Sequence, residues 1–279
     1  MFLGFILAIF AVFFTETGAS IGKFEVENKK ESLYTMGVFH LMWGTLFFFA
    51  YGLFVNNAFI FSYASLPTFV LRAVLEVFQT HITILAIVRA DRSTYSFLRS
   101  MTAPLLLGAD FLLGYSISQG QIIGIAIIAI SLIILFMNHG INKKGFGFVL
   151  FSTINAVITI SLYKYNITHF NSVAAEQGII MFILVLYFYF MARTVAKENP
   201  FRFLRERVFL GQSLAFGAGS VLGSFAYLFA PASIINTLER SLSVLASIIS
   251  GKKYFHEKHF LIKLAVFALI ATGLIFLMR

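Results

Sequence analysis

The chain has 279 residues, of which 59% are hydrophobic and 12% are charged, with 35 Phe and a mean hydropathy of +0.89. This composition lies far outside that of soluble domains and predicts a polytopic membrane protein. The net charge is +9 at pH 7 and there is no Cys, which excludes disulfides, thiolate metal sites and cysteine nucleophiles. Apolar runs take up nearly the whole length, so no soluble domain is expected.

Ten apolar segments are long enough to span a bilayer, whose hydrocarbon core of about 30 Å needs about 20 apolar residues of helix. They are apolar on all sides, which predicts helices and not the alternating strands of a β-barrel. The first segment carries Glu16 and lacks a basic leader, so we expect it to be a retained span. In chain order the predicted spans are Phe2–Gly22, Met36–Val55, Leu66–Val88, Thr94–Tyr115, Gln119–Asn138, Gly145–Tyr165, Asn171–Arg193, Val208–Ala230, Pro231–Ser250 and His259–Met278.

The two halves of the chain, residues 1–138 and 145–279, are weakly similar at a constant offset of 141 positions without a gap. Each half holds five predicted spans, and an odd number means that the second copy enters the membrane upside down. Inverted repeats of this kind are typical of secondary transporters. The sequence therefore predicts an all-α fold of two inverted five-helix repeats. Matching positions include Gly4 with Gly145, Ser20 with Ser161, Lys23 with Lys164, Arg99 with Arg240, Ser100 with Ser241 and Met137 with Met278.

The basic charge is concentrated in the connections that follow the odd-numbered spans, which hold 15 of the 21 Lys and Arg residues. By the positive-inside rule these connections are cytoplasmic and both termini lie outside. The charge is thus a topology signal, and the expected partner is the lipid bilayer and not nucleic acid. We expect a multi-pass protein of the plasma (inner) membrane, as a monomer or a homodimer.

The third span carries four polar residues, Arg72, Glu76, Gln79 and Thr80, at a spacing that places them on one helical face. Ionisable groups in hydrocarbon are costly, so they normally face the bundle interior or a wet cavity. One interpretation is that Arg72 and Glu76 only neutralise each other within the helix. The other is that this face lines a transport path and contacts the substrate.

In the ninth span, Glu239 and Arg240 lie near the middle of the membrane, and Arg240 is the repeat counterpart of Arg99 in the fourth span. Two Arg side chains are therefore expected to approach the centre from related helices. Because a guanidinium binds carboxylate or phosphate well, this pair predicts an anionic group on the substrate. Alternatively, Arg99 and Arg240 satisfy helix ends or pair with acids such as Glu16, Asp110 or Glu239.

A buried carboxylate can also carry a proton, and Glu16, Glu76 and Glu239 are the candidates for proton coupling. Neither a Gly-x4-Gly-Lys-Ser/Thr phosphate loop nor a Gly-x-Ser-x-Gly nucleophile elbow occurs in the sequence. His256 and His259 are three positions apart, not the four of a zincin helix. We therefore expect no catalytic residues, no metal site and no cofactor, and we predict that the chain is not an enzyme.

The ends of the two halves resemble the drug/metabolite transporter superfamily, in particular its EamA-like branch of ten-helix transporters. The resemblance is carried by Phe97–Leu106 leading to Gly120-x3-Gly124 and the apolar run to Met137, and by Asn236–Ser241 leading to Leu274–Met278. It implies two inverted five-helix repeats around a substrate site. Asn236-Thr237-x2-Arg240 is also similar to the ninth helix of sugar-phosphate translocators of that superfamily. The Gly-Glu pair usual in EamA members is replaced by Gly114-Tyr115 and Gly251-Lys252, and members commonly keep both termini cytoplasmic.

Together these features predict a secondary active transporter that moves a small polar metabolite by alternating access. Mixed charges along the path favour an amino-acid-like solute or a small organic anion, bound by Arg72, Glu76, Gln79, Thr80, Arg99, Glu239 and Arg240. A transporter of a phosphorylated or nucleotide-linked sugar is the main alternative. From other classes, a lipid-carrier flippase component and a non-transporting membrane scaffold remain open.

Overall fold

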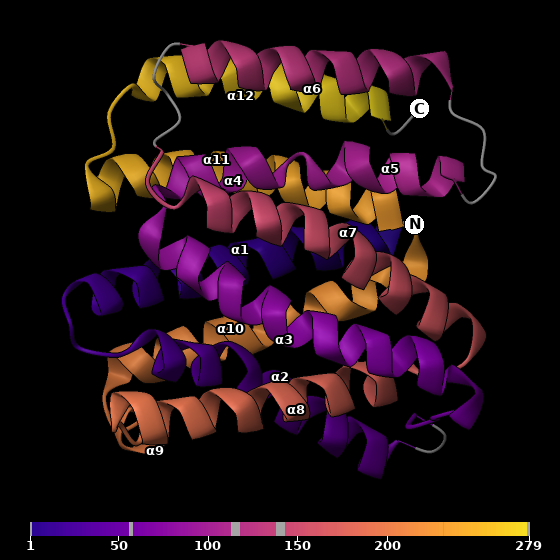
Figure 1. Cartoon of the computed structure of the whole chain (residues 1–279), viewed down its shortest axis with the longest axis vertical. Helices are drawn as coiled ribbons and strands as arrows, with labels where there is room; N and C mark the ends of the chain where they lie inside the picture. The colour runs from indigo at the N-terminus through magenta and orange to yellow at the C-terminus, as the bar shows by residue number, and fades with distance from the viewer. Residues whose placement is uncertain (1, 56–57, 113–117, 138–142, 231, 278–279) are drawn as a thin grey trace.

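The computed structural model describes residues 2–55, 58–112, 118–137, 143–230 and 232–277, without the side chains of 110–112, 136, 232–234 and 277. Within these ranges the chain is helical and contains no strand, so the all-α prediction is confirmed (Figure 1). The elements are α1 (Phe2–Glu27), α2 (Leu33–Phe54), η1 (Tyr63–Ser65), α3 (Leu66–Arg89), α4 (Arg92–Arg99), α5 (Thr102–Leu112), α6 (Gln119–Met137), α7 (Phe146–His169), α8 (Val173–Met191), η2 (Ala192–Ala196), α9 (Pro200–Phe203), α10 (Arg207–Phe229), α11 (Ala232–Phe255) and α12 (Phe260–Leu277).

Six of the described helices are long and apolar enough to cross a membrane: α1, α2, α3 with η1, α7, α8 with η2, and α10. The apolar helices α6 and α12 are shorter. Large hydrophobic side chains are exposed along these helices, as expected where lipid and not water covers the surface. The chain is therefore an integral membrane protein.

The predicted span Thr94–Tyr115 differs from the structure, which divides it into two helices, α4 and α5, that meet at Ser100 and Met101. Pro104 explains the break, because it has no N–H to donate to the Ser100 carbonyl and its ring clashes with that carbonyl in a continuous helix. The N–H of Ala103 instead donates to the Ser100 carbonyl at 3.3 Å. The residues after Leu112 in this predicted span lie outside the described ranges.

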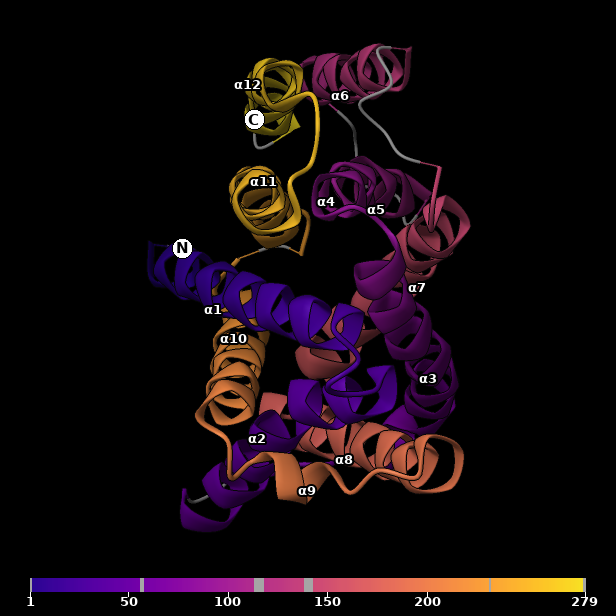
Figure 2. The same cartoon turned by 90° about the vertical axis from the view of Figure 1, so that its left-hand side faces the viewer.

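The helices pack in a consistent set of pairs. α1 crosses α10, α2 packs on α8, α3 on α7, α6 on α12, and α11 on α4 and α1. Figure 2 shows the α6 and α12 pair at one edge of the molecule, next to α11 and the α4–α5 segment, with the other helices gathered on the far side. The larger group of helices lines the cavity described below.

The described parts of the five connections rich in Lys and Arg lie at one end of the bundle. In Figure 1 the α1–α2, α3–α4, α8–α10 and α11–α12 connections and the start of α7 all lie on the left, whereas the N-terminus is on the right. At this end the side chain of Glu31 is buried and accepts a hydrogen bond of 2.8 Å from the Gln212 amide. Burial raises the pKa of Glu31 to about 8, so this contact is largely uncharged at neutral pH.

The small residues Ala215, Gly219 and Gly223 of α10 recur at a spacing of four, which allows close packing of another helix, and the two glycines lie against α1. A Cβ atom at Gly219 would clash with the Thr15 hydroxyl oxygen and would lie 3.0 Å from the Ala11 carbonyl oxygen. A Cβ at Gly223 would touch the Ala11 side chain at 3.5 Å. The close crossing of α1 and α10 thus depends on the missing side chain at Gly219.

Replacing Gly219 tests this crossing. Gly219→Ala forces a methyl group against backbone and side-chain atoms of α1, and overpacking of this kind costs about 1 to 3 kcal/mol. We expect a lower thermal unfolding midpoint in detergent. Gly211→Ala is the matched control on the same helix, because a Cβ there meets nothing within 4 Å. An equal midpoint for the two variants would contradict the close crossing.

Candidate functional site

A cavity of about 240 Å³ lies inside the bundle between α3, α7, α8 and α10. Its wall combines charged, hydroxyl, amide and aromatic groups with the small residues of α10 that face it. The lining residues are Arg72, Glu76, Thr159, Ile160, Tyr163, Gln177, Met181, Gly219, Ser220, Gly223, Ser224 and Tyr227. Of the predicted site residues, Arg72 and Glu76 line this cavity directly.

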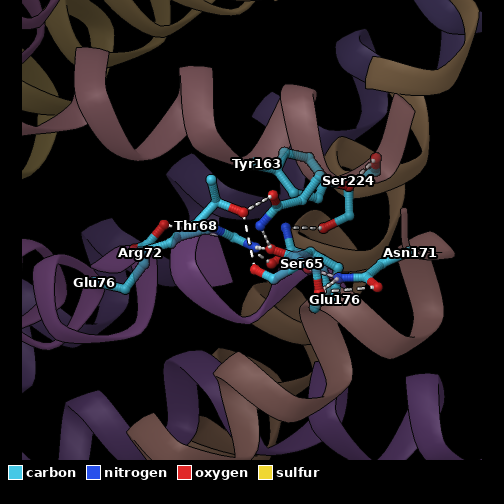
Figure 3. A network of polar contacts seen from close by, with 10 residues as sticks. Ser65, Thr68, Arg72, Glu76, Tyr163, Asn171, Glu176 and Ser224 are labelled. Atoms are coloured by element: carbon cyan, nitrogen blue, oxygen red, sulfur yellow. Dashed lines mark hydrogen bonds and ion pairs between the residues drawn. The ribbon is translucent and has the colours of Figure 1, made fainter. Parts of the chain in front are cut away.

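Arg72 is held by a strong set of partners from two other helices (Figure 3). Its guanidinium forms an ion pair of 2.7 Å with Glu176, donates a hydrogen bond of 2.9 Å to Gln177 and lies 4.6 Å above the ring of Tyr163. The side chain is 2% exposed. A buried guanidinium needs such partners, because an uncompensated charge in this environment costs several kcal/mol.

Glu176 is the main counter-charge of Arg72, and it is fully buried. It also accepts hydrogen bonds from the side-chain amides of Asn166 at 2.8 Å and Asn171 at 2.6 Å. It lies in the first turn of α8, where the helix dipole stabilises a carboxylate. This fully bonded acid joins α3, α7 and α8 as one polar cluster.

Glu76 is therefore not the principal partner of Arg72. The closest approach of the two side chains is 3.5 Å, and the Glu76 side chain is 17% exposed, whereas Glu176 is 0% exposed. The predicted pair within α3 is present, but Glu176 supplies the shorter contact from another helix. Glu76 lines the cavity, where its carboxylate can accept a hydrogen bond from a bound solute.

Gln79 and Thr80 share the predicted helical face but are not among the residues that line the cavity. Gln79 donates to the carbonyl and hydroxyl oxygens of Ser152 on α7, at 3.0 and 3.2 Å. Arg99 reaches the same two oxygens at 2.8 and 2.9 Å. The Ser152 backbone and side chain thus connect α3, the end of α4 and α7 beneath the cavity.

Glu239 lies next to the cavity wall, with the Tyr227 hydroxyl donating to it at 3.1 Å. A Cβ atom at Gly223, which lines the cavity, would lie 3.5 Å from a Glu239 oxygen. In the described part of the chain no carboxylate oxygen comes within 4.0 Å of Arg99 or Arg240. The proposed pairing of these arginines with Glu16 or Glu239 is thus not observed, and the Asp110 side chain lies outside the described residues.

Glu16 is separate from the cavity. It pairs with Arg92, the first residue of α4, and accepts a hydrogen bond from Ser243 of α11. The α4 N-terminus is further held by Glu257, which accepts from the backbone N–H of Arg92 and Ser93. Among the three candidates for proton coupling, Glu76 and Glu239 are at or beside the cavity and Glu16 joins helices elsewhere.

Several site residues were not identified from the sequence, namely Tyr163, Gln177, Ser224 and Tyr227. Gln177 donates to the Ser224 hydroxyl at 3.1 Å, and the Tyr163 hydroxyl donates to the Ser224 carbonyl at 2.9 Å. The one signal that could have indicated them was the polar Glu176–Gln177 pair in the first turn of an apolar helix.

Compared with protein-family models and with curated protein sequences, the chain matches none.

The different roles of the two acids can be tested by neutralising each one. Glu176→Gln leaves Arg72 buried with a weakened partner set, and breaking a buried pair costs about 3 to 5 kcal/mol. We expect its thermal unfolding midpoint to fall by many degrees. Glu76→Gln, the control with the same chemistry, should change the midpoint little. An equal fall in the thermal unfolding midpoint for the two variants would contradict the assignment of Glu176 as the main partner of Arg72.

Proposed function

We propose that the protein is a ten-helix secondary transporter of the drug/metabolite transporter type, which moves a small polar metabolite by alternating access. The cavity between α3, α7, α8 and α10 carries this proposal, because it brings a carboxylate, a guanidinium and neutral hydrogen-bonding groups together inside an apolar bundle. Groups of this kind in membrane helices are costly, and they commonly mark a substrate path or a binding site. The cavity volume of about 240 Å³ suits a small solute.

The helix pairing supports the inverted repeat. An offset of 141 residues maps α1 onto α7, α2 onto α8, α3 onto α10, the α4–α5 segment onto α11, and α6 onto α12. If the two repeats are exchanged, the packed pair of α1 with α10 becomes the pair of α7 with α3, and this second pair is packed as well. The pairs α2 with α8, α6 with α12 and α4 with α11 map onto themselves, and they too are packed. This is the pattern that a two-fold axis between the repeats produces.

The charges around the cavity support a zwitterion or a small organic anion as substrate. Arg72 is already neutralised by Glu176, whereas Arg99 and Arg240 have no carboxylate within 4.0 Å among the described residues. Glu76 pairs with Arg72 only at the longer distance of 3.5 Å, and Glu239 forms no ion pair in the described ranges. A solute that carries both charges, such as an amino acid, could use Glu76 in the cavity wall and the charges of Glu239, Arg99 and Arg240, which are not among the lining residues.

The other candidates make different demands. A phosphorylated or nucleotide-linked sugar would use Arg240 and Arg99 for its phosphate and would not need Glu76. A lipid-carrier flippase needs a cavity that opens to lipid. An apolar groove of about 700 Å³ does lie between α1, α10 and α11, but it shares no lining residue with the polar cavity. A scaffold would need no such cavity at all.

Counterflow in liposomes tests the proposal, using labelled amino acids, organic anions and sugar phosphates as alternative solutes. We expect exchange of an amino-acid-like solute, with the half-saturation concentration raised about tenfold or more by either Arg240→Gln or Glu76→Gln, because each removes a charge-assisted hydrogen bond. Lys252→Gln on the exposed end of α11 is the control.

A sugar-phosphate transporter gives a different result, since only Arg240→Gln would then weaken exchange. Folded protein that exchanges no solute of any class would contradict the transporter proposal.

A further inference from the structure

Lys23 near the end of α1 caps the C-terminus of α3. Its ammonium group donates to the backbone carbonyls of Ile87 and Val88, each at 3.2 Å, and to that of Ala90. The last carbonyls of a helix have no partner within the helix and carry the negative end of its dipole, so a cation there is stabilising. The side chain is almost fully buried, and the contact holds the ends of α1 and α3 together.

Lys164, the repeat counterpart of Lys23, makes the corresponding contact in the second half. Its ammonium group donates at 2.8 Å to the carbonyl of Tyr227, in the last turn of α10. The offset of 141 relates α10 to α3 and Tyr227 to Ala86, one position from a carbonyl that Lys23 contacts. Both repeats therefore use a lysine from their first helix to cap their third helix, at opposite ends of the molecule.

The two contacts are unequal in the structure. Lys23 reaches three carbonyls and also pairs with Glu27 at 3.3 Å, whereas Lys164 is half-buried and donates to a single carbonyl among the described residues. At the Lys164 end α7 and α10 are also joined by the Tyr163 hydroxyl, which donates to the Ser224 carbonyl at 2.9 Å, and by the edge-to-face rings of Tyr163 and Tyr227. The lysine contact itself is nevertheless the looser of the two, since it reaches one carbonyl and not three.

The cavity lies beside the looser contact. Tyr163 precedes Lys164 in the sequence, and the Tyr227 carbonyl accepts the hydrogen bond from Lys164. Both tyrosines line the cavity, and so does Gln177. Near Lys23 the equivalent positions are filled: Gly22 corresponds to Tyr163 and Met36 to Gln177, and a Cβ at Gly22 would lie 2.9 Å from Met36. The repeat-equivalent of the polar cavity is thus filled near Lys23, where the separate groove between α1, α10 and α11 lies on another face of α1 and is lined by Ile21 and Phe24.

We infer that Lys23 and Lys164 are alternating latches of the transport cycle, each closing its own end of the protein when it reaches several carbonyls at the end of the third helix of its repeat. In this structure the Lys23 latch is fully engaged on three carbonyls, whereas the Lys164 latch is engaged on one. If each repeat adopted the conformation that the other has here, Lys164 would engage fully and Lys23 would be released. The cavity would then open at the Lys23 end of the protein. This inference rests on the proposed alternating access, and its test needs no knowledge of the substrate.

A single reporter can follow both ends, since the natural chain has no Cys. Ser220→Cys places a thiol in the cavity wall, and a membrane-impermeant maleimide is applied to liposomes from either side. Cysteines introduced separately at the exposed Asn28 and His169, which lie at the Lys23 and Lys164 ends, assign the sides. The quantity measured is the ratio of the labelling rates of the cavity thiol from the two sides.

We expect faster labelling of the cavity thiol from the Lys164 side in the protein with both lysines. Lys23→Met should move the ratio toward the Lys23 side by about tenfold or more, because it removes charge-assisted hydrogen bonds from one state only. Lys164→Met should move the ratio the opposite way, and this variant of a half-buried lysine keeps the test valid if Lys23→Met does not fold. Lys252→Met is the charge-matched control and should leave the ratio unchanged.

Shifts of the same sign for the two lysine variants, or no shift in protein that labels from both sides, would overturn the latches and leave alternating access intact. Labelling from one side only in every variant would contradict the latches and the proposed transport function together.

Discussion

The structure depends on one electrostatic constraint, which is that a guanidinium inside an apolar bundle needs a counter-charge and hydrogen-bond acceptors. Arg72 meets it through Glu176 and Gln177 on α8, and Glu176 is in turn bonded by Asn166 on α7. Three helices are thereby fixed relative to one another around a polar centre. In a membrane, removal of either charge leaves the other unpaired, with no water to hydrate it. The cluster therefore behaves as a single unit.

This pairing determines which charges remain for a solute. With Glu176 assigned to Arg72, the Glu76 carboxylate faces the cavity and is its more exposed acid. Arg99 is anchored to neutral oxygens of Ser152, and Glu239 to the neutral hydroxyl of Tyr227. Groups that are positioned by neutral partners keep most of their charge available, which is what a binding site for an ionic solute requires.

Much of the architecture could be predicted from the sequence, because the length of each apolar segment is set by the thickness of the bilayer and its few polar residues avoid lipid. Each predicted span overlaps a described helix, and the polar face of α3 was visible as a spacing of four and three residues. The partner of Arg72 could not be predicted, since Glu176 is 104 positions away and only tertiary packing brings it closer than Glu76. Gln79 and Thr80 share the face of Arg72 but lie further along α3 and do not line the cavity, and Gln79 instead bonds Ser152 of α7.

The central claim is that Arg72 is neutralised mainly by Glu176 and much less by Glu76, and double-mutant cycles measure it most directly. The free energy of unfolding would be compared for Arg72→Met, Glu176→Met and their combination, and for Arg72→Met, Glu76→Met and theirs. We predict a coupling energy of about 2 kcal/mol or more for Arg72 with Glu176, with the double variant more stable than either single one, and well under about 1 kcal/mol for Arg72 with Glu76. A larger coupling of Arg72 to Glu76 than to Glu176 would contradict the account.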